Sequence, residues 1–456
     1  MNSKQQYIDL FRDNRTVIEA GSAPVLNCLR DEAAESLRSH DLPLKGTEGY
    51  ERTDVNGMFA PDYGLNIMRL NLPADIAEAW KCDVPNISTL FAVVANDSFI
   101  PSSGLETRLP EGVIFTSLRQ AALSWPDLVG KYYGTVATVD NAAVALNTML
   151  VQDGVFIYIP RGLRLPRPLQ LVNIFSAPAS MMALRRVLIV MEEDSEAQIL
   201  VCDHTQDTAN SYLSSEVVEI HLSPKARLDY YCIEESSEAT TRHSQMFVNQ
   251  GDESSFLTNI STLTCGNTRN SFTINVNGQR CETRLAGMAI ATGRMHIDNS
   301  VQLRHLAPKC YSNQLFKYVA DDNATGAFQG LIYVSPEAPF TDAYQTCRSV
   351  LASPDARMHA KPQLEIYNDE VKCSHGSTTG QLDAKALFYM RTRGIPENQA
   401  RTMLMQAFMA DVIDTVKMEG LHDRLRHLVE KRFAGDNSLC GECRANCRDA
   451  SSNTNE

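Results

Sequence analysis

The chain has 456 residues, of which 43% are hydrophobic and 21% charged, a globular composition that fits two or three domains or one elongated β domain. Its formal net charge of −13, without a cluster of Lys and Arg, argues against a nucleic-acid binder. The first residues, MNSKQQYIDLFRDNRTVIEA, contain no apolar core of a signal peptide, and no apolar run approaches the roughly 18 residues of a membrane span. We therefore expect a cytoplasmic protein with no membrane and no nucleic acid among its partners.

Helical periodicity predicts a mainly helical N-terminal domain over residues 1–115. Apolar residues such as Ile8 and Phe11 recur at helical spacing from the start of the chain. Further along, Pro73 is placed to begin a helix over Ala74–Trp80, because proline is tolerated in the first turn.

Residues 116–380 carry a strand pattern with a long repeat. In VVEIHLSPKARLDYYCI, apolar residues alternate on both sides of a Ser-Pro-Lys turn, so each strand has one buried face. Turn centres recur at a spacing typical of repeat architectures, near Asp194, Pro224, Asp252, Asn277 and Pro308. This period favours a β-solenoid over a sandwich, whose turns come about every 8 to 12 residues.

Residues 381–435 change to helical periodicity and predict a C-terminal helical domain. Asp383 is placed to cap its first helix, and Pro396 to begin the second. The predicted core stripe of the second helix is Ala400, Met403, Leu404, Ala407, Phe408 and Val412. That of the third is Leu421, Leu425, Leu428, Val429 and Phe433. The remaining residues, 436–456, are small and polar and read as a flexible tail that contains cysteines.

No common catalytic signature is present. The chain lacks G-x-x-x-x-G-K-[ST], G-x-G-x-x-G, G-x-S-x-G and H-E-x-x-H, so we expect no enzyme that depends on these motifs. A solenoid-shaped carbohydrate-active enzyme stays open as an alternative, because carboxylates are plentiful, although no pair of them stands out.

Cys373 and His375 are the leading candidate site residues. At positions i and i+2 of a strand, their side chains leave the same face and could chelate one soft or borderline metal ion. A nucleophilic Cys–His dyad is a second interpretation. A third is purely structural, with Cys373 packed in the core, His375 bonded locally and the last strand capped by a glycine turn at Gly376. Spacing alone favours the structural interpretation, because two ligands are too few for a metal site.

The tail offers a second metal-like pattern, Cys440-x2-Cys443-x3-Cys447. With a fourth ligand from elsewhere, these cysteines could hold zinc, iron or a cluster in transit, and solvated thiols are the alternative. A stand-alone metal-binding protein is therefore another open function.

Two further pairs of polar residues are weaker candidates. His296 and His305 lie in strand-like sequence, where a structural role is the expectation. Arg391 and Arg393 could pair with acidic groups of a partner or stabilise the end of a helix.

From about Met191 to Met418 the chain resembles the SufB/SufD family of iron–sulfur cluster assembly proteins. The resemblance is carried by FQGLIYVSPEA, TDAYQTCRSVL, PQLEIYNDEVKCSHGSTTGQLDAKALFYMRTRGI and QARTMLMQAFMADVI. Within the family, CSHG at this position resembles the SufD branch. The segment DLPLKGTEGYERTDV also resembles that branch, with Tyr50 where a tryptophan is common, whereas the first hundred residues otherwise match weakly.

The resemblance implies a fold and partners. The fold is mainly β with flanking α, a right-handed parallel β-helix between an N-terminal and a C-terminal helical domain. The β-helix is expected to pair with a SufB-like paralogue, and the C-terminal helices to dock a SufC-like ABC-type ATPase. The nucleotide chemistry would then belong to the partner, in agreement with the missing P-loop.

The resemblance also implies a role for the candidate residues. His375 is expected at the interface with the SufB-like subunit, where a nascent iron–sulfur cluster or iron would be held transiently by both partners, with Cys373 as its neighbour. The expected function is that of a non-enzymatic scaffold subunit of the Suf complex. The cluster type, the use of a reduced flavin, homodimer formation and the role of Cys373 stay open.

Overall fold

The computed structural model describes residues 3–72, 88–206 and 209–435. The predicted helix at Ala74–Trp80 and the tail 436–456 lie outside these residues. Among the described residues, no helix is both long enough and apolar enough to cross a membrane.

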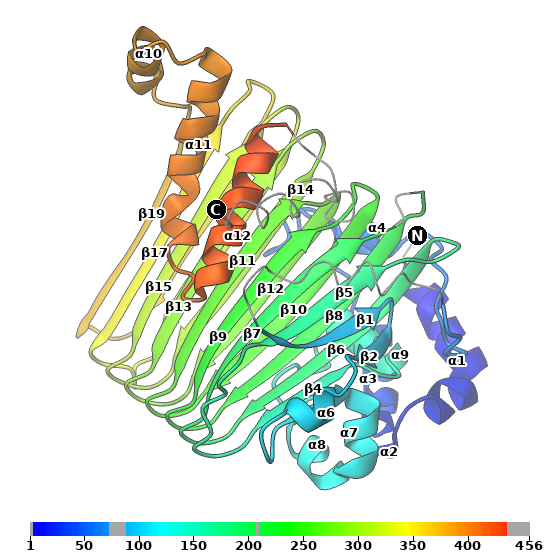
Figure 1. Cartoon of the computed structure of the whole chain (residues 1–456). Coiled ribbons are helices and arrows are strands. Elements are labelled where there is room, and N and C mark those ends of the chain that lie inside the picture. The colour runs from blue at the N-terminus through cyan, green and yellow to red at the C-terminus, as the bar shows by residue number, and fades with distance from the viewer. Residues whose placement is uncertain (1–2, 73–87, 207–208, 436–456) are drawn as a thin grey trace, which may run out of the picture.

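In the described chain, the strands form two sheets that face one another and together make a β-solenoid (Figure 1). The first sheet has nine strands: β3 (Ile114–Ser117), β4 (Val155–Ile159), β6 (Met181–Met191), β8 (Tyr212–Leu222), β10 (Thr240–Gln250), β12 (Asn267–Val276), β14 (His296–His305), β16 (Thr325–Val334) and β18 (Arg357–Ile366). The second has ten: β1 (Leu90–Ala95), β2 (Ser98–Pro101), β5 (Leu169–Phe175), β7 (Glu196–Thr205), β9 (Arg227–Glu235), β11 (Ser255–Thr264), β13 (Glu282–Ala291), β15 (Tyr311–Ala320), β17 (Thr341–Leu351) and β19 (Val371–Gly380).

From β4 onward the chain alternates between the two sheets, so each strand up to β17 pairs in parallel with the strand two positions later. Antiparallel pairs occur in the described chain only where β2 meets β1 and β3 meets β4. The predicted parallel β-helix is therefore confirmed, with the coils stacked in register.

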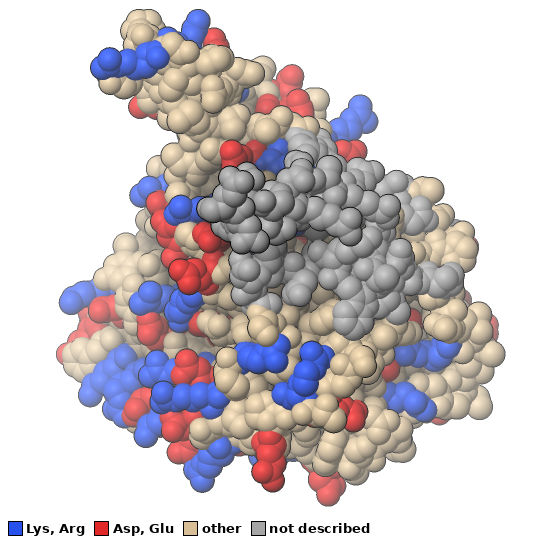
Figure 2. Space-filling view, in the orientation of Figure 1, with Lys and Arg blue, Asp and Glu red and all other residues tan. Residues whose placement is uncertain are grey.

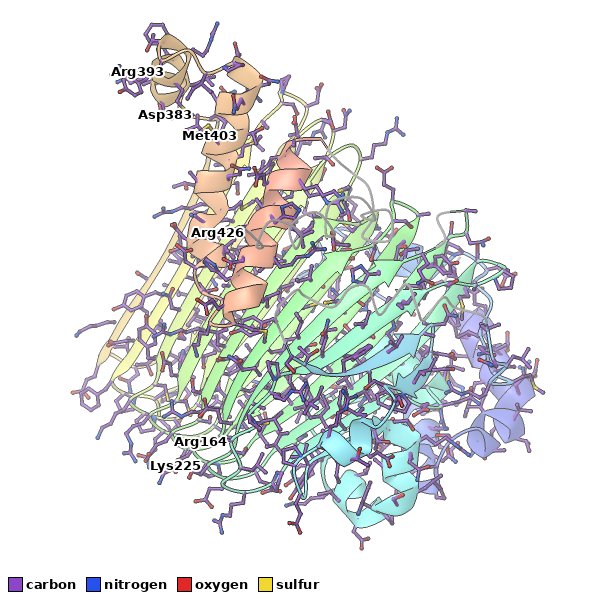
Figure 3. The ribbon with its side chains drawn as sticks, in the orientation of Figure 1. Arg164, Lys225, Asp383, Arg393, Met403 and Arg426 are labelled. Carbon is purple, nitrogen blue, oxygen red and sulfur yellow. The ribbon has the colours of Figure 1, made fainter. Side chains whose placement is uncertain are left out.

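The turns that lead from the nine-stranded to the ten-stranded sheet form a ladder of residues in the left-handed region, 27 to 31 residues apart: Asp194, Lys225, Glu253, Arg280, Lys309 and Phe340. Each of them donates its backbone N–H to a carbonyl of the next coil, as Lys225 does to Asp252 at 2.7 Å. Charged side chains of both signs are interspersed along this rim (Figure 2), where Arg164 and Lys225 lie (Figure 3). The repeat inferred from the sequence is thus confirmed.

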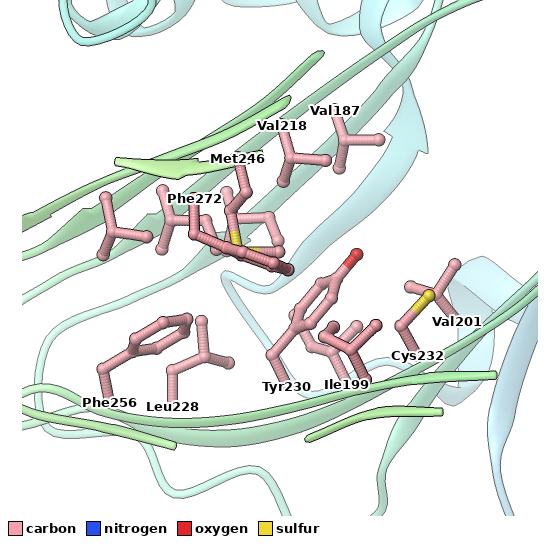
Figure 4. Close-up of a cluster of buried hydrophobic side chains, with 14 of the residues drawn as sticks. Val187, Ile199, Val201, Val218, Leu228, Tyr230, Cys232, Met246, Phe256 and Phe272 are labelled. Atoms are coloured by element: carbon pink, nitrogen blue, oxygen red, sulfur yellow. The ribbon is translucent and has the colours of Figure 1, made fainter. Parts of the chain in front are cut away.

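The main hydrophobic core lies between the two sheets (Figure 4). Val218 and Met246 of the nine-stranded sheet face Leu228 and Tyr230 of the other, and all four are nearly inaccessible to solvent. Full burial of one such side chain contributes about 1.5–3 kcal/mol, so this core stabilises the solenoid substantially.

N-terminal helices cover the outer face of the nine-stranded sheet, where their cluster includes Met182 and Leu213 of the sheet. They are α1 (Lys4–Ala20), α2 (Pro24–Asn27), α3 (Arg30–Ser39), α4 (Val55–Met58), α6 (Leu105–Arg108), α7 (Leu118–Ser124), α8 (Pro126–Tyr132) and α9 (Ala142–Leu150) in chain order, with α6 beside β1 rather than on this face. Helices continue to Leu150, beyond the predicted boundary at 115, and β1 lies before that boundary yet pairs with β5. The strand periodicity is too weak in this stretch to mark the change.

Three C-terminal helices follow β19: α10 (Ala384–Thr392), α11 (Glu397–Ile413) and α12 (Glu419–Phe433). Helices α11 and α12 pack on the outer face of the ten-stranded sheet (Figure 1). The predicted stripe of α12 is confirmed, with Phe433 only half-buried.

The predicted stripe of α11 is partly wrong. Ala400 and Val412 are buried as expected, but the other buried positions are Met405, Met409 and Ile413. Met403 is 43% exposed. Apolar residues occur on nearly every side of α11, so its periodicity could not identify the face that packs on the sheet.

Candidate functional site

Cys373 and His375 lie on β19, the last strand of the ten-stranded sheet. Strand β19 pairs in parallel with β17, which places Cys373 beside Ala343 and His375 beside Gln345. Both neighbours point into the space between the sheets and are almost fully buried. Because side chains in register share a face, Cys373 and His375 also face the interior, at its open end.

Cys373 is half-buried and packs against a small apolar cluster that contains Ile332, Val334 and Ala343. Burial raises the pKa of its thiol, and the nearby carboxylate of Asp342 adds to this effect. The thiol is therefore protonated at neutral pH, which does not fit an activated nucleophile.

His375 is exposed, in contrast to Gln345 of β17 and Gln314 of β15, which lie in register with it. Gln345 donates from Nε2 to Oε1 of Gln314 at 2.9 Å, and both residues are buried. Oε1 of Gln345 has no hydrogen-bond partner among the described residues. A buried acceptor thus lies next to His375, a feature that sequence spacing did not reveal.

Gly376 lies in the middle of β19, paired with Thr346, so its predicted alternative role in a strand-ending turn is wrong. A Cβ atom at Gly376 would meet nothing within 4 Å. The surface around this part of the motif is open on the outer side of the sheet.

The last coil is an open end of the solenoid. Strands β18 and β19 are ten residues long, and in the described chain neither has a strand on its outer edge. At the opposite end the sheets finish in β2 and β3, which are four residues long. Short edge strands limit unwanted pairing, whereas long unpaired edges invite another chain.

Side chains that face the interior are correspondingly accessible in this coil. Leu364 and Val371 are half-buried, and Ile366 is 39% exposed. Pro362, which lacks a backbone N–H, lies in β18, a position that proline tolerates on an edge strand.

The interior also contains a network of ion pairs that sequence reasoning missed. Arg242 lies 2.8 Å from Glu216, 3.4 Å from Asp203 and 3.8 Å from Glu234, and the four side chains are buried. The charges of Asp203 and Glu216 raise the pKa of Arg242 although burial opposes them, so it stays a cation. The signal in the sequence is charge at inward-facing strand positions, which needs the register to be recognised.

The projecting helix α10 begins at Asp383, whose Oδ1 accepts hydrogen bonds from the backbone of Lys385 at 2.8 Å and Ala386 at 3.3 Å, as predicted. None of its residues is buried, and Phe388 and Tyr389 are 68% and 58% exposed. Figure 3 shows Arg393 at this tip, far from the solenoid.

The two arginines of this region have local partners. Arg391 forms an exposed ion pair with Glu397 at 3.2 Å. Arg393 lies 5.2 Å from the centre of the Tyr389 ring and donates to its hydroxyl group.

The two strand histidines differ from one another. His305 is fully buried, its Nε2 lies 2.9 Å from Oγ of Ser312, and burial lowers its pKa to about 4, as a structural histidine requires. His296 bonds to Thr53 through Nε2 at 2.9 Å, and it also borders a cavity.

Cys440, Cys443 and Cys447 lie outside the described residues. Within the described ranges, no three His, Cys, Asp or Glu side chains are placed to hold a metal ion together. Cys373 and His375 on β19 are two potential metal ligands, fewer than a metal site needs.

Both halves of the chain match models of known protein families. The SufBD core domain of the SUF system for FeS cluster assembly matches residues 174–408, and the SufBD protein N-terminal region matches residues 1–171. An iron–sulfur cluster assembly SufBD family protein of Synechocystis is 27% identical over 88% of this chain and 90% of its own. The iron–sulfur cluster assembly protein SufD of Bacillus subtilis is 24% identical over 89% and 94%. SufD of Escherichia coli is 35% identical over 37% of this chain and 40% of its own.

Together the two family models cover nearly all of residues 1–408. The chain belongs to the SufBD family of iron–sulfur cluster assembly proteins and is SufD-like.

Proposed function

We propose that this chain is a non-enzymatic scaffold subunit that pairs its last coil with the β-helix of a SufB-like subunit. The observation that carries the proposal is the pair of ten-residue edge strands, β18 and β19, at the end where interior side chains are accessible. A partner that continues both sheets would satisfy their free backbone groups and bury apolar side chains such as Ile366.

His375 would then lie within the interface as one ligand of a nascent iron–sulfur cluster or of iron, which is the cargo of the complex. A cluster normally requires about four ligands, and the two donors on β19 fall short of this number. The partner would supply the others, so the site would form only in the complex and could release its cargo when the subunits shift.

Cys373 is the weaker ligand of the two. Its thiol must lose a proton to bind iron, and burial raises its pKa. We expect it to contribute chiefly by packing under the interface.

The C-terminal helices are the proposed docking surface for a SufC-like ABC-type ATPase. Helix α10 has no buried residue and displays Phe388 and Tyr389, while Met403 is exposed on α11 next to it (Figure 3). A helix without a buried face is stabilised by what it binds. The ATPase would supply the nucleotide hydrolysis for which this chain has no P-loop.

The first experiment tests whether the edge strands β18 and β19 form the interface with the SufB-like subunit. The chain is co-expressed with SufB-like and SufC-like partners and the complex is isolated by size exclusion with light scattering. Ile366→Glu should abolish the pairing, since it places a charge among apolar side chains. Leu123→Glu, at an exposed apolar residue of α7, is the matched control and should pair normally. Normal pairing of Ile366→Glu would refute the edge as the interface.

The same measurement separates a heterocomplex from a homodimer. A complex with the SufB-like chain supports the proposal, and a dimer of this chain alone that excludes the SufB-like chain contradicts it.

The second experiment tests the site. His375→Ala should leave the complex intact but reduce its content of iron and acid-labile sulfide at least fivefold. Ser377→Ala, the next exposed residue facing the same side of β19, is the control and should retain the wild-type content. Unchanged cluster content in His375→Ala would remove this residue from the site. Flavin measured in the same samples decides whether a reduced flavin accompanies the complex.

A further inference from the structure

A cavity of about 340 Å³ lies between the segment of residues 45–63 and the outer face of the nine-stranded sheet. The volume is within the range of small-molecule sites, about 300–1,000 Å³. Its lining residues are Lys45, Arg52, Thr53, Asp54, Gly57, Met58, Pro61, Tyr63, Thr241, Asn267 and His296. None of its lining residues belongs to the open last coil or to the C-terminal helices.

The floor of the cavity is a row of polar side chains at the beginning of three neighbouring strands. Thr241 of β10, Asn267 of β12 and His296 of β14 are in register. The same row continues through Thr325 to Arg357 at the edge of the sheet. Stacked coils therefore align hydrogen-bonding groups along one side of the cavity.

The segment of residues 45–63, which forms the wall of the cavity, is held against the sheet by several contacts. Arg269 of β12 donates to the carbonyl of Gly49 at 2.7 Å, and its guanidinium group lies 4.2 Å from the centre of the Tyr50 ring. Oγ1 of Thr53 donates to Asp298 at 2.5 Å. The cavity is thus preformed, which reduces the entropy cost of binding a ligand.

Two cations of the lining are not neutralised. Lys45 and Arg52 are exposed and form no ion pair or hydrogen bond with any described residue. The carboxylate in the lining, Asp54, accepts a hydrogen bond from the backbone of Gly57 at 2.9 Å as the cap of α4. Positive charge therefore exceeds negative charge at the cavity.

Burial lowers the pKa of two nearby histidines, and the cations at the cavity add to the effect. Burial first, and then the charges of Arg52 and Lys45, lower the pKa of His359. Burial likewise lowers the pKa of His296, with Lys45 among the charges that add to the effect and Asp298 opposing it.

Uncharged polar groups complete the lining. Oδ1 of Asn267 is buried, has no hydrogen-bond partner among the described residues and, as an acceptor, would take a hydrogen bond from a donor on the organic part of a ligand. The side chains of Thr241 and Tyr63 add two hydroxyl groups to the lining. Hydroxyl and amide donors together with Arg and Lys are the groups that bind phosphate oxygens.

We propose that this cavity binds a small molecule through a phosphate group, with Lys45 and Arg52 as the charged ligand-binding residues and the row of Thr241, Asn267 and His296 as its polar floor. The volume exceeds the need of inorganic phosphate, so the remainder of the ligand would be an organic group that extends toward Met58 and Pro61.

The test measures binding to the full-length chain by isothermal titration calorimetry at constant ionic strength, with inorganic phosphate and AMP as probes. We expect saturable binding of both, with AMP tighter than phosphate. The double variant Lys45→Ala/Arg52→Ala should weaken binding at least tenfold. The control is Arg227→Ala/Arg348→Ala, which removes two exposed cations from the ten-stranded sheet and should bind as the wild type does.

Circular dichroism and thermal unfolding establish that both double variants keep the fold. Absence of binding by the wild type, equal binding by the Lys45/Arg52 double variant, or equal weakening by the control would each overturn the proposal. Cluster assembly is not involved in this measurement, so its outcome is independent of the proposed scaffold function.

Discussion

Glu51 and Lys361 are 310 residues apart in the chain and form an ion pair, with Oε1 of Glu51 2.7 Å from Nζ of Lys361. Gln329 of β16 also donates to the Glu51 carboxylate. Lys361 belongs to β18, so this pair connects the segment before α4 directly to the last coil. The N-terminal region thus contacts the same coil that carries the candidate site.

The pair predicts a small pH-dependent contribution to stability. Burial alone would raise the pKa of Glu51, but the hydrogen bonds from Lys361 and Gln329 help to lower it to about 2. The ordinary value is about 4.3, so between about pH 4.5 and 2 the unfolded chain binds more protons than the folded one. The contribution is present above this window and is lost as the pH falls through it.

Glu51→Gln should therefore lower the free energy of unfolding at pH 7 by less than about 1 kcal/mol, because both side chains are partly exposed. Urea unfolding measures this change, and NMR titration of the Glu51 carboxyl carbon measures the pKa. Glu337→Gln, at an exposed carboxylate outside this contact, is the control. A titration midpoint of Glu51 near 4.3 would contradict the ion pair.

Replacement of Arg242 is expected to lower the free energy of unfolding much more. Replacement by Met would leave Asp203, Glu216 and Glu234 buried without their common cation. Loss of one partner from a buried ion pair typically costs about 3–5 kcal/mol. Urea unfolding of Arg242→Met should show a loss of this size, and Arg227→Met, at an exposed site, should not. Equal stability of the two variants would show that the interior carboxylates do not depend on Arg242.

Two glycines in the last coils predict opposite outcomes. A Cβ atom at Gly330 would lie 2.1 Å from Nε2 of Gln345, a buried side chain that is bonded to Gln314. Gly330→Ala should therefore destabilise the chain by about 1–3 kcal/mol. Gly376→Ala meets open space and should leave stability unchanged or raise it by up to about 1 kcal/mol. Thermal unfolding of the isolated chain compares the two, and a greater loss for Gly376→Ala would contradict the register of β19.

Removal of the cap at Asp383 is expected to destabilise helix α10 locally. The helix has no buried residue, so the cap at Asp383 is a large part of its stability. Asp383→Ala should cost about 1 kcal/mol and increase hydrogen exchange of the α10 amides about fivefold, while amides of α12 stay unchanged. Asp383→Asn retains an accepting oxygen and should exchange as the wild type does. Unaltered exchange in Asp383→Ala would show that the cap does not hold the helix.

Local patterns in the sequence were sufficient for the architecture. The apolar periodicity of Val218 with Ile220 and of Leu228 with Tyr230 identified the strands and their core face, and the turns near Asp194 and later positions revealed the coil length. The expectation of a single buried face was wrong for these strands, because the N-terminal and C-terminal helices cover the outer faces of the two sheets. The cap at Asp383 was recognisable as well. Each of these features depends on residues close together in the chain, or on a repeat that makes distant residues equivalent.

Only the tertiary structure decided what these elements bring together. Cys373 and His375 share a face on any strand, but the register of β19 against β17 determines that this face is the interior and that the coil is open. In the same way, Thr53 meets His296 across 243 residues. Such contacts depend on how coils stack and where the chain returns, which no local period encodes.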